Sequence, residues 1–297
     1  MQCVRDLYLA VQPFFGFPMK KELQEIIELM SELYGKDIAG YSEAFIAKTV
    51  EKRLREISVG TIADYLHQLS GDAREAHRFC SSLNITYSEF FRNRFTFGLL
   101  EHVILPRLVQ QKQKCHPPEI RVWSAGCAAG QEAYSLAILL DELVLARGLN
   151  VSFRIFGTDI SVAELARARA GAYDVKAIGN VSMRHIHTYF IQKDETFEVV
   201  PELRDRIDFS FYDLMDRSSI CPPSSIYGDF DIVICGNLLL YYREEIHQFV
   251  LDKLRQCLSD EGFFVTGEAE RAIIEQAGGF SAVAPPAPVY QLTKRRI

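Results

Sequence analysis

Two glycines, four positions apart, stand where a strand-like run gives way to a helical one. The apolar residues Ile120, Val122 and Trp123 precede Gly126 and Gly130, and such a run is typical of a buried parallel strand. Glycine lets the backbone turn sharply and lets a ligand approach where a Cβ atom would clash. The segment therefore predicts a ligand site between a strand and the start of a helix.

The spacing of these glycines indicates which ligand to expect. Gly126-x-x-x-Gly130 is neither the G-x-G-x-x-G of a dinucleotide site nor the G-x-x-x-x-G-K-[ST] of a P-loop. No lysine follows the turn directly, so we do not expect it to grip a phosphate. A nucleoside with a zwitterionic tail fits better, and S-adenosylmethionine is the first candidate.

Polar residues follow three other strand-like runs. They are Asp159 after Phe153–Thr158, Asp213 after Phe209–Tyr212, and Asn237 after Asp231–Gly236. In doubly wound sheets the ligand lies outside the carboxyl ends of the strands, where the Asp159 carboxylate could accept two ribose hydroxyls. Each residue alone is an ordinary cap or turn residue, but their occurrence together with the glycine turn favours a binding site.

The elements that must position these residues fall into two parts. Apolar residues recur at helical spacing up to about residue 90, which predicts an all-helical N-terminal domain. From Ile120 onward strands alternate with helices, which predicts a mostly parallel sheet with helices on both faces. We expect an α/β fold in which residues 1–90 form the helical domain, 91–118 a linker helix and entry loop, and 119–297 the doubly wound domain. A turn-rich stretch at about 172–212 interrupts the alternation and predicts a small β insertion.

Composition narrows the class of partner. The chain has 297 residues and a net charge of -6, which argues against nucleic acid as the main partner. The seven cysteines are scattered without a C-x-x-C pair, so we expect neither a disulfide framework nor a zinc site, and no metal. This usage suits a reducing cytoplasm. No apolar run reaches the length of a membrane span, and we expect a soluble cytoplasmic protein.

Four ordered motifs make a family resemblance specific. They are Phe90-Phe-Arg92, the stretch from Gly126 to Ala137, Thr158-Asp159-Ile-Ser, and the stretch from Phe230 to Tyr241. Together they resemble the CheR-type chemotaxis receptor glutamate O-methyltransferases, from about Lys20 to Leu292. The resemblance implies a helical N-terminal domain, a Rossmann-like methyltransferase domain that binds S-adenosylmethionine and releases S-adenosylhomocysteine, and a small antiparallel subdomain inserted after Asp159.

The resemblance also implies roles for individual residues. Glu132 would take the methionyl amino group, Asp159 the ribose, and Asp213 and Asn237 the adenine end. Arg92 and Tyr241 would face the transferred methyl group and carry catalysis. The full set of cofactor-binding positions implied is Thr86, Ser88, Arg92, Gly126, Glu132, Asp159, Asp213, Leu214, Asn237 and Leu238.

The chemistry implied asks little of the protein. A substrate glutamate is already ionised at neutral pH, so attack on a sulfonium methyl is mainly a matter of positioning and desolvation. Arg92 can hold the incoming carboxylate with two hydrogen bonds, and the Tyr241 hydroxyl can orient one of its oxygens.

The chain departs from the family pattern at several positions. Gly236 stands where Cys-Arg-Asn is usual, Thr86 stands where the family has Asn, and the late Gly-His-Ser-Glu is here Gly267-Glu-Ala-Glu270. These differences support an alternative of another class, a regulatory or interaction protein that binds S-adenosylmethionine with weak or lost activity. A methyltransferase acting on bases finds less support, because the Asn-Pro-Pro-Tyr motif is absent.

Recognition of the substrate is predicted to use the helical domain. Lys48, Lys52 and Arg55 form a basic stripe, with Arg53 nearby. These four residues suit acidic receptor helices, although a solvated helix face explains them equally well. Family members that tether to a receptor's C-terminal pentapeptide have a longer, glycine-containing loop in the insertion. Here 191–196 is short, charged and without glycine, so we expect no tail-pentapeptide tethering.

Overall fold

The structure is a computed structural model that describes residues 20–225 and 228–293. The chain divides into two compact units, one up to Leu83 and one from Asn84 onward. The first part of the predicted helical domain, residues 1–19, lies outside the described residues. The limits of the predicted linker at 91 and 118 stay a prediction.

The first unit is a group of helices. Those described are α2 (Lys20–Tyr34), α3 (Glu43–Ile57), α4 (Ile62–Gly71) and α5 (Ala73–Ser82). Side-chain oxygens of Ser42, Thr61 and Asp72 accept backbone N–H groups at the starts of α3, α4 and α5, as N-cap residues do. The helical character predicted for this region is confirmed.

A buried charged cluster holds this unit together. Arg53 donates from Nε and Nη2 to the two carboxylate oxygens of Glu75, at 2.8 and 2.6 Å, and the Tyr65 hydroxyl donates to Glu75 at 3.0 Å. Arg53 is 7% exposed and Glu75 1%. Removing one partner of such a buried pair costs about 3–5 kcal/mol. The prediction that Arg53 docks a receptor is therefore wrong, because its guanidinium faces the interior of the unit.

The second unit is built on a seven-stranded sheet in the order β6-β2-β1-β7-β8-β10-β9. The strands β6, β2, β1, β7 and β8 pair in parallel, and β10 pairs antiparallel with β8 and β9. Their bounds are β1 (Glu119–Ala125), β2 (Ser152–Asp159), β6 (Ile207–Phe211), β7 (Phe230–Cys235), β8 (Leu258–Thr266), β9 (Phe280–Ala282) and β10 (Val289–Leu292). The predicted mostly parallel α/β sheet is confirmed.

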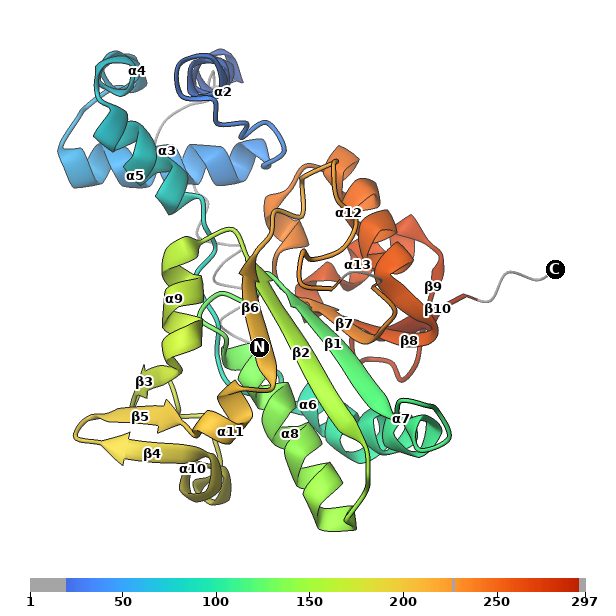
Figure 1. Ribbon diagram of the computed structural model, residues 1–297. Helices are drawn as coiled ribbons and strands as arrows, with labels where there is room; N and C mark the ends of the chain where they lie inside the picture. Colours follow the sequence, from blue (N-terminus) through green and yellow to red (C-terminus); the bar gives the residue numbers. More distant parts are fainter. Residues whose placement is uncertain (1–19, 226–227, 294–297) are drawn as a thin grey trace. The chain divides into compact units, whose positions relative to one another are not determined.

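Helices cover both faces of this sheet (Figure 1). On one side lie α8 (Gln131–Arg147) and α9 (Val162–Ala170), and on the other α12 (Glu244–Cys257) and α13 (Arg271–Ala277). A further segment before β1 packs on α8 and consists of α6 (Arg94–Leu99), η1 (Leu100–Ile104) and α7 (Leu105–Lys112). Neighbouring residues of β1 serve both faces: Val122 joins the core beneath α8, while Trp123 packs against Phe230.

The small insertion is a separate three-stranded sheet in the order β3-β5-β4. It comprises β3 (Ala172–Asp174), β4 (Phe190–Lys193) and β5 (Thr196–Val199), with α10 (Met183–Tyr189) before β4 and α11 (Pro201–Arg204) after β5. The insertion is shorter than the predicted range of about 172–212. Ile207–Phe211 pairs with β2 as the edge strand of the main sheet, because its alternating burial matches a strand with one covered face.

None of the helices within the described ranges is both long and apolar enough to cross a membrane.

Candidate cofactor and active site

The glycine turn after β1 has the geometry that requires glycine. Gly126 and Gly130 have φ values of 76° and 88°, a region that side chains disfavour. A Cβ atom on Gly126 would lie 3.1 Å from Leu238 Cδ2, and one on Gly130 would lie 3.0 Å from Phe209 Cζ. The turn thus packs against Phe209 in the middle of β6 and against Leu238 in the loop after β7.

Asp159 ties the end of β2 to this turn. One of its carboxylate oxygens accepts the Ala128 N–H at 2.9 Å and the other accepts the Ser161 N–H at 2.8 Å. Burial raises the pKa of the Asp159 carboxyl, and these two backbone N–H groups act in the opposite direction. Each oxygen keeps a lone pair beyond its backbone bond, so the carboxylate both shapes the turn and can accept further hydroxyl groups.

Glu132 lies in the first turn of α8. Its Oε1 accepts a hydrogen bond from the Ser124 hydroxyl at 2.8 Å. Burial raises the pKa of the Glu132 carboxyl to about 7, while the Ser124 hydroxyl and the charge of Arg92 act to lower it. A Cβ atom on Gly236 would lie 3.7 Å from Glu132 Oε2. The departure at position 236 therefore falls directly beside this carboxylate.

Arg92 belongs to a segment that is fixed to the sheet domain. Its neighbour Phe91 has a φ of 48° and donates its N–H to the Ser135 hydroxyl of α8 at 3.0 Å. Phe90 is fully buried. The Arg92 guanidinium is stacked over the Tyr87 ring, 4.9 Å from its centroid. The exposed Arg92 side chain is thus anchored by its neighbours while its charge acts on Glu132.

The ends of β6 and β7 complete the arrangement. Asp213 accepts the Met215 N–H at 2.8 Å in a tight turn, and Leu214 beside it is buried. Asn237 has a φ of 60°, which asparagine tolerates better than most residues. A short 3-10 helix, η2 (Leu239–Tyr241), begins two residues after Asn237, and Tyr241 is its last residue.

The fold brings most of the predicted cofactor residues to one edge of the sheet, because β6, β2, β1 and β7 are parallel neighbours. The residues found at this edge are Gly126, Glu132, Asp159, Asp213, Leu214, Asn237 and Leu238. The positive charge of Arg92 acts to lower the pKa of Glu132. Thr86 is exposed and Ser88 part-buried. The assignment of these two residues to the cofactor site stays a prediction.

Several residues that support the site escaped the sequence analysis. Ser124, Ala128 and Ser161 hold the two carboxylates in place, and each is a common residue type without a distinctive motif. Glu270, part of the late Gly267-Glu-Ala-Glu270 segment, is fully buried. No group of three or more His, Cys, Asp or Glu side chains in the part of the chain that the structure describes could hold a metal ion.

Two family models match this chain. The CheR methyltransferase SAM-binding domain matches residues 86–285, and the CheR methyltransferase all-alpha domain matches residues 21–83. The chain belongs to the CheR methyltransferase family. The resemblance carried by the four sequence motifs is thereby confirmed.

Curated relatives agree with the family models. A chemotaxis protein methyltransferase of Listeria monocytogenes is 28% identical over 86% of this chain and 92% of its own length. Chemotaxis protein methyltransferase 1 of Pseudomonas aeruginosa is 30% identical over 72% of this chain and 75% of its own. A chemotaxis protein methyltransferase of Borreliella burgdorferi is 26% identical over 84% of this chain and 88% of its own length.

As a member of this family the chain is an enzyme, an S-adenosylmethionine-dependent protein-glutamate O-methyltransferase. The residues at the sheet edge fit that cofactor. The glycine turn allows Leu238 to pack directly on its backbone, Asp159 retains acceptor capacity for hydroxyl groups, and Glu132 offers a carboxylate to an ammonium group.

Proposed function

We propose that this enzyme methylates glutamate side chains of a chemoreceptor or a related signalling protein in the cytoplasm, and that the residues at the sheet edge hold S-adenosylmethionine as the family resemblance implies. The observation that carries the proposal is the convergence of Asp213, Asp159, Glu132 and Asn237 at the carboxyl ends of four neighbouring parallel strands.

The proposed division of labour follows from charge and position. Glu132 binds the methionyl ammonium group, Asp159 the ribose hydroxyls, and Asp213, Leu214, Asn237 and Leu238 surround the adenine. Bound S-adenosylmethionine would supply the electrophilic methyl group. Arg92 receives the substrate carboxylate and Tyr241 orients one of its oxygens, so that the ionised oxygen is held in line for attack.

The function is tested by incubating the protein with S-adenosylmethionine labelled in its methyl group and membranes that contain chemoreceptors. We expect label in receptor protein that base releases as methanol, as it does from a methyl ester. Cofactor binding without any protein-bound label would instead favour the regulatory alternative, which Gly236 supports because no side chain accompanies Glu132 at that position.

The Glu132 carboxyl predicts a pH dependence of cofactor binding. With a pKa of about 7, about a tenth of this group is ionised at pH 6 and about three quarters at pH 7.5. Since the ionised form attracts the ammonium group, affinity should rise roughly five- to tenfold over this range, with release of a proton. Calorimetry in buffers of different ionisation enthalpy measures both effects.

The raised pKa of Glu132 also makes the stability of the folded protein depend on pH. Between pH 4.5 and about 7 the folded, ligand-free protein holds a proton on Glu132 that the unfolded chain has lost, so this group destabilises the protein as the pH rises. Glu132→Gln should bind the cofactor more weakly and without the rise in affinity. A rise that persists in this variant would assign the titration to another group.

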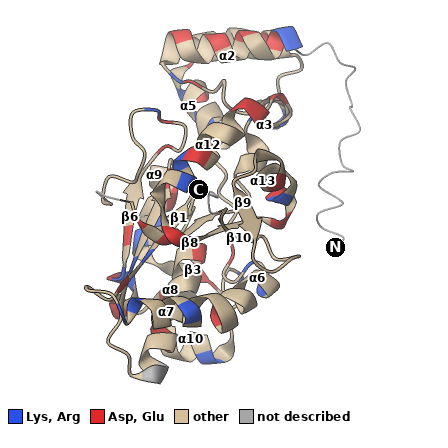
Figure 2. Ribbon diagram, turned by 90° about the vertical axis from the view of Figure 1, so that its right-hand side faces the viewer, with Lys and Arg blue, Asp and Glu red and all other residues tan. Residues whose placement is uncertain are grey.

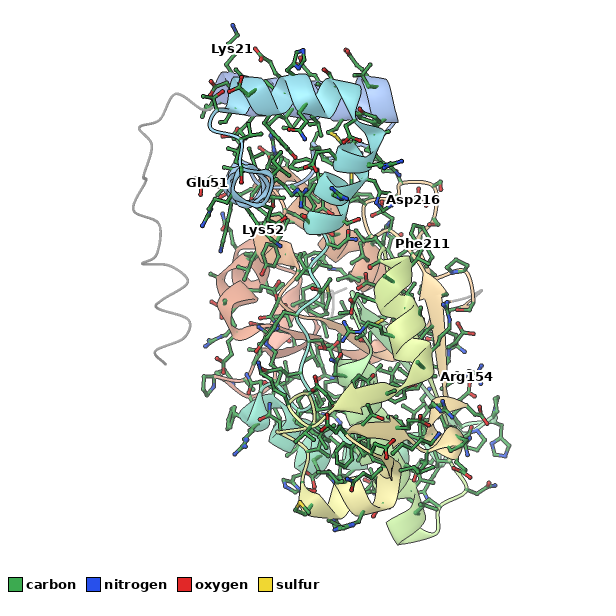
Figure 3. All side chains as sticks on the ribbon, turned by 90° about the vertical axis from the view of Figure 1, so that its left-hand side faces the viewer. Lys21, Glu51, Lys52, Arg154, Phe211 and Asp216 are labelled. Atoms are coloured by element: carbon green, nitrogen blue, oxygen red, sulfur yellow. The ribbon has the colours of Figure 1, made fainter. Side chains whose placement is uncertain are left out.

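We also propose that substrate docking uses the exposed part of the basic stripe, Lys48, Lys52 and Arg55 on α3, and needs no receptor tail peptide. Lys52 lies 3.8 Å from Glu56, and Arg55 lies 3.8 Å from Glu51; Figure 3 marks Glu51 and Lys52 on this helix. These pairs are exposed, and such pairs contribute little to stability, which leaves the cations available to an acidic partner.

Support for the absence of tethering comes from the insertion. β4 and β5 are joined by the two residues Asp194 and Glu195, and Lys193 at the end of the edge strand β4 pairs with Glu198 at 2.7 Å. Charged side chains and tight turns discourage the addition of another strand at an edge.

Replacing Lys48, Lys52 and Arg55 together by glutamine should raise the apparent KM for receptor several-fold and flatten its salt dependence, because surface attraction acts mostly on encounter. Glutamine is preferred to glutamate since Glu51 and Glu56 are already close. The assay is initial-rate methylation of a full-length receptor and of one that lacks its C-terminal pentapeptide, and we expect equal rates for the two receptors.

The matched control is glutamine at Lys20, Lys21 and Lys36, which removes the same charge from other exposed positions of the first unit. Figure 2 shows how α2 concentrates its basic residues at its start, with acidic residues along the rest. An equal rise of the apparent KM in both triple variants would show that only the net charge of the first unit matters, and not the position of the stripe. Loss of methylation with the shortened receptor would overturn the proposal on tethering.

A further inference from the structure

The side chain of Glu270 closes on the loop that follows β7. Its Oε2 accepts the Asn237 N–H at 2.7 Å, and its Oε1 accepts the N–H groups of Leu238 and Leu239 at 2.7 Å each. Three consecutive backbone N–H groups therefore point at one carboxylate, as in the anion-binding nests of other proteins. We call this contact the Glu270 clamp.

The carboxylate is also held from its own side. The Gly267 N–H donates to Oε2 at 2.9 Å, and Thr266 Oγ1 lies 2.8 Å from Oε2 and 2.9 Å from the Cys235 carbonyl oxygen, so its single proton serves both acceptors. Glu270 is fully buried, and no lysine or arginine among the described residues forms an ion pair with it. A buried carboxylate requires compensation, and here four backbone N–H groups supply it, three of them from the loop, with the Thr266 hydroxyl also within hydrogen-bond distance.

The clamp fixes a backbone conformation that residues other than glycine rarely adopt. Asn237 has a φ of 60°, and a Cβ atom on Gly267 would lie 2.9 Å from both Asn237 Oδ1 and Glu270 Oε2. The Asn237 side chain thus packs against the bare backbone of Gly267. Its direction is set by the same short segment that presents Glu270.

The clamp also places the residues on either side of Asn237. Leu238 Cδ2 reaches over Gly126 of the glycine turn, since a Cβ atom there would be only 3.1 Å away. The short helix η2, which ends at Tyr241, starts at Leu239, where the third clamped N–H lies. One carboxylate therefore sets the position of Asn237 and Leu238 and the backbone that leads to Tyr241.

We propose that Glu270 is a positioning residue for catalysis: it holds the loop 237–239 so that Asn237 and Leu238 meet the cofactor and Tyr241 meets the methyl acceptor. The proposal rests on the proposed function for the roles of those three residues. The clamp itself rests on the hydrogen bonds alone.

The test is Glu270→Gln, which keeps the size of the side chain but turns one acceptor oxygen into an NH2 group. That group would face at least two N–H donors and can accept from none of them. We expect the affinity for S-adenosylhomocysteine to fall at least tenfold by calorimetry, and kcat at saturating cofactor to fall further. Amide hydrogen exchange at 237–239 should accelerate while exchange in β1 and β2 stays slow.

Glu275→Gln is the matched control, because Glu275 is an exposed acid of the next helix, and it should leave all three readouts unchanged. If Glu270→Gln does not fold, Glu270→Asp keeps the charge but withdraws the carboxylate from the three loop N–H groups by one methylene, and a smaller shift of the same kind is expected. Unchanged exchange at 237–239 in a folded Glu270→Gln protein, or in Glu270→Asp if Glu270→Gln does not fold, overturns the clamp.

Faster exchange with unchanged affinity and kcat would leave the clamp intact and overturn its role in positioning. Failure of the wild-type protein to bind S-adenosylhomocysteine would instead count against the proposed function. The two proposals can therefore fail separately.

Discussion

Asp159→Ala should weaken the binding of S-adenosylmethionine by at least tenfold. If the carboxylate accepts two ribose hydroxyls, its removal deletes charge-assisted hydrogen bonds of about 1.5–3 kcal/mol each. The structure adds a second consequence, because Ala128 and Ser161 lose the acceptor of their N–H groups. We therefore expect a lower melting temperature as well, and calorimetry must be done below that temperature.

Ser161→Ala separates the two effects. It removes the hydroxyl that accepts the Glu164 N–H at the start of α9 and so lowers stability nearby, but it leaves the carboxylate in place. Its cofactor affinity should match the wild type. A folded Asp159→Ala protein that binds the cofactor with wild-type affinity would remove Asp159 from the binding site.

Arg92→Ala should reduce kcat/KM for the protein substrate by about 10- to 100-fold, since a bidentate bond between guanidinium and carboxylate is lost at the reacting group. Tyr241→Phe should have a smaller effect, because it removes one neutral hydroxyl. Initial rates at saturating S-adenosylmethionine measure both. Saturation matters because the charge of Arg92 also favours the ionised form of Glu132, so its loss should weaken cofactor binding as well.

Arg94→Ala is the natural control for Arg92. Arg94 is an exposed arginine two residues later in the same segment, and its replacement removes the same charge without touching Glu132. We expect wild-type rates. If Arg92→Ala and Arg94→Ala behave alike at saturating cofactor, Arg92 has no direct part in catalysis and only stabilises the local charge.

Much of the fold could be read from the sequence because the signals are local. A buried strand, two glycines and a helix start follow one another between Ile120 and Leu140, and the strand and helix periods on either side fix the class of sheet. Parallel strands place their carboxyl ends together, so the sequence alone predicts Asp159, Asp213 and Asn237 at one edge of the sheet.

What the tertiary structure decided depends on contacts between residues far apart in the chain. Arg53 reads as one more cation on a helix, and only its pairing with Glu75, 22 residues later, makes it a buried structural residue. Ile207–Phe211 reads as part of the insertion, because pairing with β2 leaves no local signal. Glu270 lies in an acidic segment of ordinary composition, and its clamp on Asn237, 33 residues earlier, exists only once β7 and β8 are neighbours. Local patterns specify which elements form, whereas the pairing of buried polar groups is specified by packing, which brings distant donors and acceptors within hydrogen-bond range.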